Sequence, residues 1–125
     1  MSWYVEPNMI ERAEAGAMVW SLSGDWTRDL PVHVREDALK ALGREITGPL
    51  VLDLTNVAFI DSWAEELIAD TTQYGRDLGH EVALVVDATR GAAFDGVRHV
   101  FERRKLDIET FDQLEQALAK MGGAA

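Results

Sequence analysis

Four short stretches of apolar and β-branched residues predict strands. They lie at residues 3–10, 18–23, 50–54 and 82–86. Pro7 places the first stretch at an edge of the sheet, because proline has no N–H to donate to a neighbouring strand. The stretches 50–54 and 82–86 are apolar almost throughout, which is typical of central strands that are covered on both faces. A shorter fifth strand is expected to include Ile108.

Between these strands, apolar residues recur every three or four positions, as they do on one face of a helix. Helices are expected over residues 30–46, 63–78, 90–104 and from an N-cap at Asp112 to Met121. Gly79 is expected to follow the end of the second helix. A turn at 13–16 joins the first two strands into a hairpin, and the later alternation of strands and helices implies parallel pairing. The sequence therefore predicts an α/β fold with a central mixed β-sheet and interspersed α-helices.

Length and charge narrow the class of protein. The chain has 125 residues, no linker and no internal repeat, so a single domain is expected over 1–125, with its core at 3–121 and a frayed tail at 122–125.

The formal net charge of −10 argues against nucleic acid and an anionic membrane surface as partners, because both attract Lys and Arg. No apolar run approaches the roughly 20 residues that cross a bilayer, and the N-terminus lacks the features of a secretion signal. These features predict a cytoplasmic protein without membrane insertion.

No pattern that is typical of a catalytic or metal site occurs in the sequence. The chain has no cysteine, which excludes disulfides, thiolate catalysis and cysteine-based metal sites. His33, His80 and His99 are scattered and are expected at the surface, and neither a phosphate-binding glycine loop nor a serine nucleophile elbow is present. Asp53 is expected at the end of its strand, bonded to a neighbouring loop. The interpretation is a protein that is not an enzyme and needs no metal or cofactor, with a small enzyme of unknown type as an alternative.

One segment, residues 52–63, combines features of a modification site. A buried strand is followed by a short loop at 55–60 and then by Asp61 and Ser62 at the start of a helix. A phosphate on Ser62 would meet unpaired backbone N–H groups and the positive end of the helix dipole, so this serine is a candidate phosphoacceptor. The same residues fit a capping box, in which Ser62 caps the helix and Glu65 reaches back to it. Taken alone, the spacing favours the plain cap.

The run from Asp53 to Trp63 resembles the signature of STAS domains, the family of anti-sigma factor antagonists. That signature is an apolar strand, then Asp-Leu-(Ser/Thr)-x-Val-x-Phe-(Ile/Met)-Asp-Ser, then a helix. Further segments resemble the family in the same order along the chain, namely Leu22 to Asp25, Gly79 to Val85 and Phe111 to Leu118. The resemblance covers most of the chain and implies a single STAS-like domain.

In STAS antagonists the serine after the aspartate is phosphorylated by a partner kinase that is also an anti-sigma factor. The unmodified antagonist binds this kinase and frees the sigma factor, and phosphorylation breaks the complex. The resemblance therefore implies partner switching controlled by phosphorylation of Ser62, with an anti-sigma factor/GHKL-type serine kinase as the partner. It raises the phosphoacceptor interpretation of Ser62 above the plain cap.

Two departures from the family pattern bear on the expected partners. The family commonly continues Asp-Ser-(Ser/Thr)-Gly, whereas Trp63 and Ala64 follow Ser62, and Asp-Ser-aromatic is closer to the scaffold STAS proteins of stressosomes. Glu65 and Glu66 would repel a phosphate, which either counts against phosphorylation or is the means by which it weakens a contact. Stressosome proteins are thus also expected partners, and a homo-oligomer is left open. The alternative function is a non-phosphorylated STAS subunit of a lipid-transport ABC complex that binds its ATPase.

Charge is unevenly distributed along the chain. Residues 89–106 carry a net charge of +3 and are expected to form a solvated helix face, whereas the rest of the chain carries −13. The acidic loops are expected to gather at one end of the sheet and to dock a partner with a basic surface. If Trp26 and Trp63 are exposed, they are expected to anchor that partner. If they are buried, they are core residues. The predicted partner-binding residues are Asp25, Trp26, Asp61, Trp63, Glu65 and Glu66.

Overall fold

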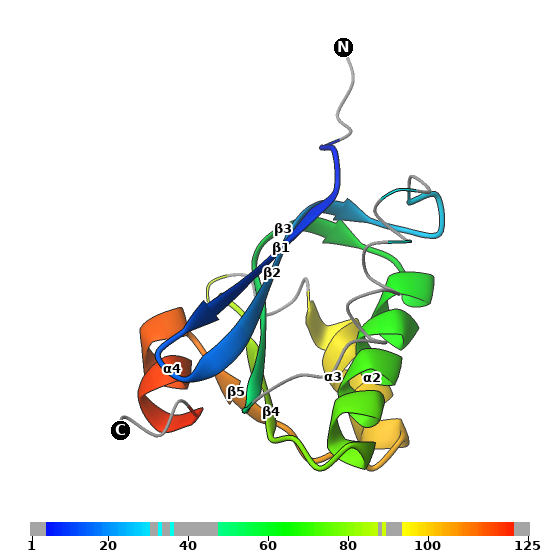
Figure 1. The fold of residues 1–125 in the computed structure, drawn as a ribbon. Coiled ribbons are helices and arrows are strands. Elements are labelled where there is room, and N and C mark those ends of the chain that lie inside the picture. The colour runs from blue at the N-terminus through cyan, green and yellow to red at the C-terminus, as the bar shows by residue number, and fades with distance from the viewer. Residues whose placement is uncertain are drawn as a thin grey trace.

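A mixed β-sheet forms the centre of the protein in the computed structural model, which describes residues 5–30, 33, 36, 48–87, 89 and 94–121. Its described strands are β1 (Asn8–Glu14), β2 (Ala17–Trp26), β3 (Leu50–Ile60), β4 (Val82–Val85) and β5 (Glu109–Phe111). The described helices are α2 (Ser62–Asp77), α3 (Asp95–Arg103) and α4 (Leu114–Met121). The strand order is β1-β2-β3-β4-β5, with β1 antiparallel to β2 and the other pairs parallel (Figure 1). The predicted α/β fold with a mixed sheet is confirmed.

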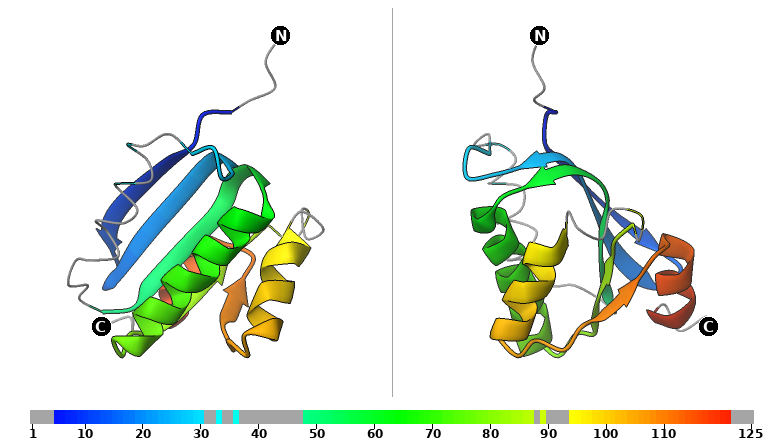
Figure 2. Two further views of the ribbon diagram at one scale, coloured as in Figure 1. Left: turned by 90° about the vertical axis from the view of Figure 1, so that its right-hand side faces the viewer. Right: turned by 180° about the vertical axis from the view of Figure 1, so that it is seen from behind.

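The two faces of the sheet are covered by different helices, α2 and α3 on one side and α4 on the other (Figure 2). Alternate residues of each central strand therefore enter different parts of the core. Leu50, Leu52 and Leu54 pack on the side of α2 and α3, whereas Val51 packs on the side of α4. The side chains of β4 are also buried on both faces. This confirms the prediction of central strands that are covered on both sides.

β3 continues through residues 55–60, so the prediction of a loop at these residues is wrong. Two register shifts against β2, one before Asn56 and one after Val57, each place an extra residue in β3. These bulges interrupt the two-residue alternation by which a strand is identified in a sequence, which is the physical reason for the error. They also keep the end of β3 paired with the end of β2, where Asp25 lies opposite Phe59.

Asp53 lies within β3 rather than at its end, and it is buried. Its carboxylate accepts two hydrogen bonds from Thr55, from the backbone nitrogen at 3.0 Å and from the side-chain hydroxyl at 2.7 Å. The predicted bond to a neighbouring loop is therefore wrong. The carboxylate instead satisfies donors of its own strand at the first bulge, where the sheet pairing is interrupted.

Other boundaries differ from the predictions by a few residues. Three predicted features lie wholly or partly outside the described residues. They are most of the helix predicted over 30–46, the start of the helix predicted from residue 90, and the tail 122–125. Ile108 precedes β5 rather than lying within it. Because α4 begins at Leu114, the predicted N-cap Asp112 is one residue too early. The end of α2 agrees with the prediction, since Gly79 follows the C-cap Leu78.

Residues 5–7 run beside the end of β2, and β1 begins only at Asn8, later than the sequence predicts. The backbone N–H of Val5 donates to the Asp25 carboxylate at 3.1 Å, and the N–H of Asp25 donates to the Val5 carbonyl at 2.8 Å. Gly24 permits this approach, because its φ is +78° and a Cβ at this position would overlap the backbone of residues 5–7.

Gly24→Ala is expected to lower the free energy of unfolding by about 1–3 kcal/mol, because the methyl group strains the backbone and displaces residues 5–7. Gly79→Ala is the matched control. Its φ is +87°, but nothing lies within 4 Å of its Cβ position, so only backbone strain of about 1 kcal/mol is expected. Urea unfolding of both variants measures the difference. Equal losses would show that the contact with residues 5–7 does not stabilise the fold.

Candidate functional site

The junction between β3 and α2 is held by the carboxylate of Asp61. One carboxylate oxygen accepts a hydrogen bond from the backbone N–H of Ala64 at 2.9 Å, and the other accepts one from the backbone N–H of Arg28 at 3.0 Å. The backbone N–H of Asp61 donates to the carbonyl of Trp26 at 3.1 Å. Asp61 therefore caps α2 and ties its N-terminus to the chain that follows β2.

Asp61, rather than Ser62, is the N-cap of α2, so the predicted capping box of Ser62 and Glu65 is wrong. The reason is the backbone conformation: Asp61 has φ −99° and ψ 177°, as an N-cap requires, whereas Ser62 is already the first helical residue. Ser62 is exposed, and its hydroxyl forms no hydrogen bond with any residue that the structure describes. The hydroxyl is open to an enzyme, at a helix end that favours negative charge.

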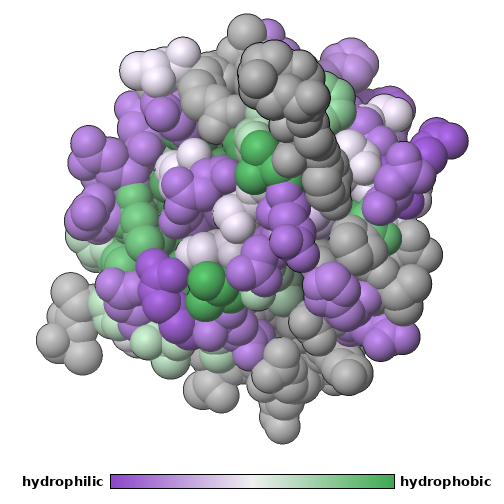
Figure 3. Space-filling view, turned by 90° about the horizontal axis from the view of Figure 1, so that it is seen from above, coloured by the Kyte–Doolittle hydropathy of each residue, from purple (hydrophilic) through white to green (hydrophobic). Residues whose placement is uncertain are grey.

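The aromatic side chains near Ser62 differ in their accessibility. Trp26 is 1% exposed and belongs to the core, so it is not an anchor for a partner. Trp63 is half-buried, with part of its side chain packed against the core. Phe59 is 57% exposed, and the sequence reasoning missed it because the bulges in β3 decide its direction. Seen from above, the molecule shows separate apolar areas between hydrophilic ones (Figure 3).

Glu66 faces α3 and forms ion pairs with Arg103 and Arg104. Arg104 also contacts Asp70, one turn further along α2, at 2.7 Å. These ion pairs join α2 and α3, which lie side by side (Figure 2). The hydrogen bond from Arg103 lowers the pKa of Glu66, and Arg104 adds to this effect while partial desolvation opposes it. The basic helix is solvated as predicted, with Arg103 57% exposed, but its C-terminal end also forms ion pairs with α2.

Glu65 has no ion-pair partner within the part of the chain that the structure describes. Its carboxylate lies against Gly96 in the first turn of α3, where a Cβ would overlap it. Burial raises the pKa of Glu65, and the negative charges of Asp61 and Glu66 raise it further, while His99 opposes them. Negative charge is therefore concentrated beside Ser62.

The structure gathers some of the predicted partner-binding residues and separates others. Those that flank Ser62 at the start of α2 are Asp61, Trp63 and Glu65. Asp25 lies at the end of β2, and its carboxylate is bonded to the N-terminal segment. The sequence reasoning missed Arg28, whose backbone N–H reaches Asp61 across 33 positions of the chain. No local pattern marks a contact of that kind.

Glu65→Gln and Glu66→Gln are expected to differ in their effects on stability at pH 7. The folded-state pKa of Glu66 is lowered, so its charge stabilises the fold above the ordinary value of 4.5, and this contribution is lost as pH falls through the lowered pKa. The folded-state pKa of Glu65 is raised, so the contribution of this residue to the stability of the fold is present in acid. That contribution is lost as pH rises through the raised pKa. At pH 7, Glu66→Gln therefore lowers the thermal midpoint, and Glu65→Gln raises it or leaves it unchanged.

Thermal unfolding at pH 7 and at about pH 3 measures both variants, and their difference is expected to shrink in acid because both carboxylates become protonated in the unfolded chain. A loss of stability in Glu65→Gln at pH 7, with none in Glu66→Gln, would contradict the assignment of the ion pairs to Glu66.

The described residues hold no group of three His, Asp or Glu side chains arranged to bind a metal ion. None of the described helices combines the length and the apolar character needed to cross a membrane.

The sequence matches no protein-family model and no curated protein. Its fold matches solved structures. An anti-sigma factor antagonist from Mycobacterium paratuberculosis matches with a TM-score of 0.66 and 17% identity, over 92% of this chain and 93% of that chain. The anti-sigma factor antagonist SpoIIAA in its unphosphorylated form matches with a TM-score of 0.65 and 16% identity, over 94% of this chain and 98% of that chain. SLC26A9 matches with a TM-score of 0.70 and 17% identity, over 93% of this chain but 20% of its own.

These likenesses show the fold of the chain. It is the fold of the two anti-sigma factor antagonists over almost their whole length, and the STAS fold implied by the sequence resemblance is thereby confirmed. SLC26A9 contains the same fold within one fifth of a longer chain. Because the fold occurs in such different settings, a function has to be inferred from Ser62 and its surroundings.

Proposed function

We propose that this protein is an anti-sigma factor antagonist that changes partners when Ser62 is phosphorylated. The position of Ser62 carries the proposal: the residue is exposed, its hydroxyl has no hydrogen-bond partner among the described residues, and it begins α2 in a fold shared with two antagonists. The unmodified protein binds an anti-sigma factor that is also a GHKL-type serine kinase, in the cytoplasm. It acts as substrate and ligand of that kinase rather than as an enzyme.

The docking surface proposed for the kinase surrounds Ser62. Phe59 and Trp63 supply accessible aromatic surface, which often contributes much of the binding energy at protein interfaces. Asp61 and Glu65 supply negative charge, which favours a partner with a basic docking surface and speeds the encounter.

Phosphorylation would change the charge of this surface more than its shape. A phosphate adds about −1.5 to −2 charges, next to the Glu65 carboxylate, whose pKa is raised by burial and further by the negative charges of Asp61 and Glu66. The N-terminus of α2 offsets part of the repulsion between these charges within the protein, because its dipole favours negative charge. The protein therefore tolerates the phosphate, while a partner that had matched the unmodified serine no longer fits.

Mass measurement after phosphorylation tests the acceptor. The protein is incubated with ATP and the GHKL-type serine kinase encoded nearest to it, and the intact mass is recorded. One phosphoryl group is expected on the wild type and on Thr110→Ala, a control that removes another exposed hydroxyl, and none on Ser62→Ala. If Ser62→Ala still gains a phosphoryl group, or if the wild type gains none, the proposal is contradicted.

Co-purification of the unmodified protein tests the class of partner. Recovery of a GHKL-type kinase or of stressosome proteins supports partner switching. Recovery of an ABC ATPase, with no kinase, would overturn it in favour of a lipid-transport subunit.

A further inference from the structure

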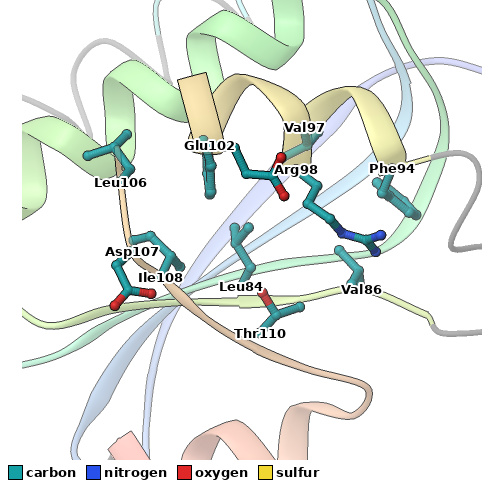
Figure 4. A pocket seen from close by; sticks show the side chains of 11 residues that line it. Leu84, Val86, Phe94, Val97, Arg98, Glu102, Leu106, Asp107, Ile108 and Thr110 are labelled. Carbon is teal, nitrogen blue, oxygen red and sulfur yellow. The ribbon is translucent and has the colours of Figure 1, made fainter. Parts of the chain in front are cut away.

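A cavity of about 210 Å³ lies between α3 and the strands β4 and β5 (Figure 4). Its inner wall is apolar. Leu84 and Val86 line it from the strand side, and Val97 and Phe101 line it from the helix. All four are less than 10% exposed, so the inner wall of the cavity belongs to the core, while exposed residues of α3 and β5 line its open side.

The volume limits the class of ligand. A cavity of about 150 Å³ lined by apolar side chains is large enough to hold a benzene ring, whereas pockets for drug-sized ligands and cofactors start at about 300 Å³. A space of about 210 Å³ therefore admits one aromatic ring or one branched aliphatic group, and little volume remains beside it. It excludes a nucleotide or a haem as a fully enclosed ligand.

Two side chains of opposite charge stand at the cavity, one helical turn apart on α3. Arg98 and Glu102 both line it, and they extend from the helix toward the strands in Figure 4. Residues four apart on a helix commonly form an ion pair, yet these two do not pair with each other. Arg98 instead contacts Asp95 at 3.3 Å, and the two side chains are 62% and 65% exposed, so this contact is weak.

The remaining polar groups are arranged around these charges. Glu102 has no hydrogen-bond or ion-pair partner for its carboxylate among the described residues. Thr110 offers a hydroxyl on the strand side of the cavity. Asp107 lies at the end away from Arg98 (Figure 4). The cavity thus has an apolar interior and, beside it, one loosely held guanidinium and the carboxylates of Glu102 and Asp107, for which the described residues supply no partner.

We propose that this cavity binds a free apolar α-amino acid, with the side chain in the cavity, the carboxylate on Arg98 and the ammonium group on Glu102. A guanidinium matches a carboxylate in shape and charge, and an ionised carboxylate accepts hydrogen bonds from an ammonium group. A simple fatty acid would be repelled by Glu102, and a simple amine would be repelled by Arg98. A zwitterion attached to a small apolar group satisfies both charges and also fills the cavity.

Titration of the full chain with L-leucine and L-phenylalanine, followed by calorimetry and by amide NMR shifts, tests this site. At least one of the two is expected to bind saturably with a Kd of about 1 mM or lower, and the shifts are expected to concentrate on α3, β4 and β5. Two analogues of phenylalanine separate the charges: 3-phenylpropionate lacks the ammonium group, and phenethylamine lacks the carboxylate. Each is expected to bind at least about 10-fold more weakly than the amino acid, as the loss of one charge-assisted contact implies.

Charge-neutralising variants test the two contacts. Arg98→Gln and Glu102→Gln are each expected to weaken binding about 10-fold, whereas Arg12→Gln, which removes a charge on β1, leaves it unchanged. Thermal unfolding checks that each variant is folded; Arg98 and Glu102 are exposed, and Arg12 is half-buried. No saturable binding at about 10 mM of either amino acid, or equal binding of an analogue that lacks one charge, overturns the proposal.

Discussion

Ser62→Glu is expected to lower the affinity of the protein for its kinase partner about 100-fold, and Ser62→Ala is expected to leave it within about threefold. The serine is exposed and unbonded within the described residues, so its removal costs the fold little. A carboxylate in its place adds charge to a helix turn that already holds Asp61 and Glu65. A charged side chain no longer fits a partner that matches the unmodified serine, and a charge that the interface buries without a partner costs several kcal/mol, which corresponds to a loss of this size.

The control for this prediction adds the same charge far from the proposed docking surface. Gln116 is exposed on α4, which covers the opposite face of the sheet from α2. Gln116→Glu is therefore expected to bind the kinase like the wild type. Titration of each variant into the kinase measures the affinities. A loss of affinity in Gln116→Glu as large as that in Ser62→Glu would show that net charge, rather than the position of the charge, weakens the complex.

Trp26→Ala is expected to lower the free energy of unfolding by about 3–5 kcal/mol, as replacing large buried aromatic side chains by alanine commonly does. The side chain is 1% exposed, and its indole N–H donates to the carbonyl of Ser23 at 2.9 Å. Its removal leaves a cavity and takes this donor from the Ser23 carbonyl. Because domains of this size have only about 5–15 kcal/mol of stability in total, the variant is expected to be near the limit of folding.

Trp63→Ala is the matched comparison for Trp26→Ala. Trp63 is half-buried, so its truncation is expected to cost less than half as much stability and, unlike a core substitution, to weaken kinase binding in the folded variant. Urea unfolding gives both stabilities. If Trp26→Ala costs no more than Trp63→Ala, the distinction between a core tryptophan and an interface tryptophan is wrong.

Local patterns in the sequence identify much of the fold, because the buried strands and amphipathic helices have recognisable periods. Leu50 and Val51 are apolar neighbours in a strand, and the structure buries them on opposite faces of the sheet as that pattern predicts. The extension of β3 could not be predicted in this way. Its bulges depend on pairing with β2, and their effect is to leave Phe59 exposed at the proposed docking surface.

The site was predictable in position but not in its contacts. Asp61 and Ser62 are both good capping residues, so the sequence cannot decide between them, and only the bond from the Ala64 N–H and the extended backbone show that Asp61 is the cap. The pairing of Glu66 with Arg103 requires α2 and α3 to be packed together. The cavity beside α3 is assembled from segments that are distant in the sequence, so no motif marks it.

The affinity of the kinase for the protein before and after phosphorylation of Ser62 tests the proposed switch most directly. The two forms are prepared from one batch, separated by mass, and titrated into the same kinase preparation without ATP. The unmodified protein is expected to bind, and the phosphorylated protein is expected to bind at least about 100-fold more weakly, with full affinity restored when a phosphatase removes the phosphate. Equal affinity of the two forms would contradict the account.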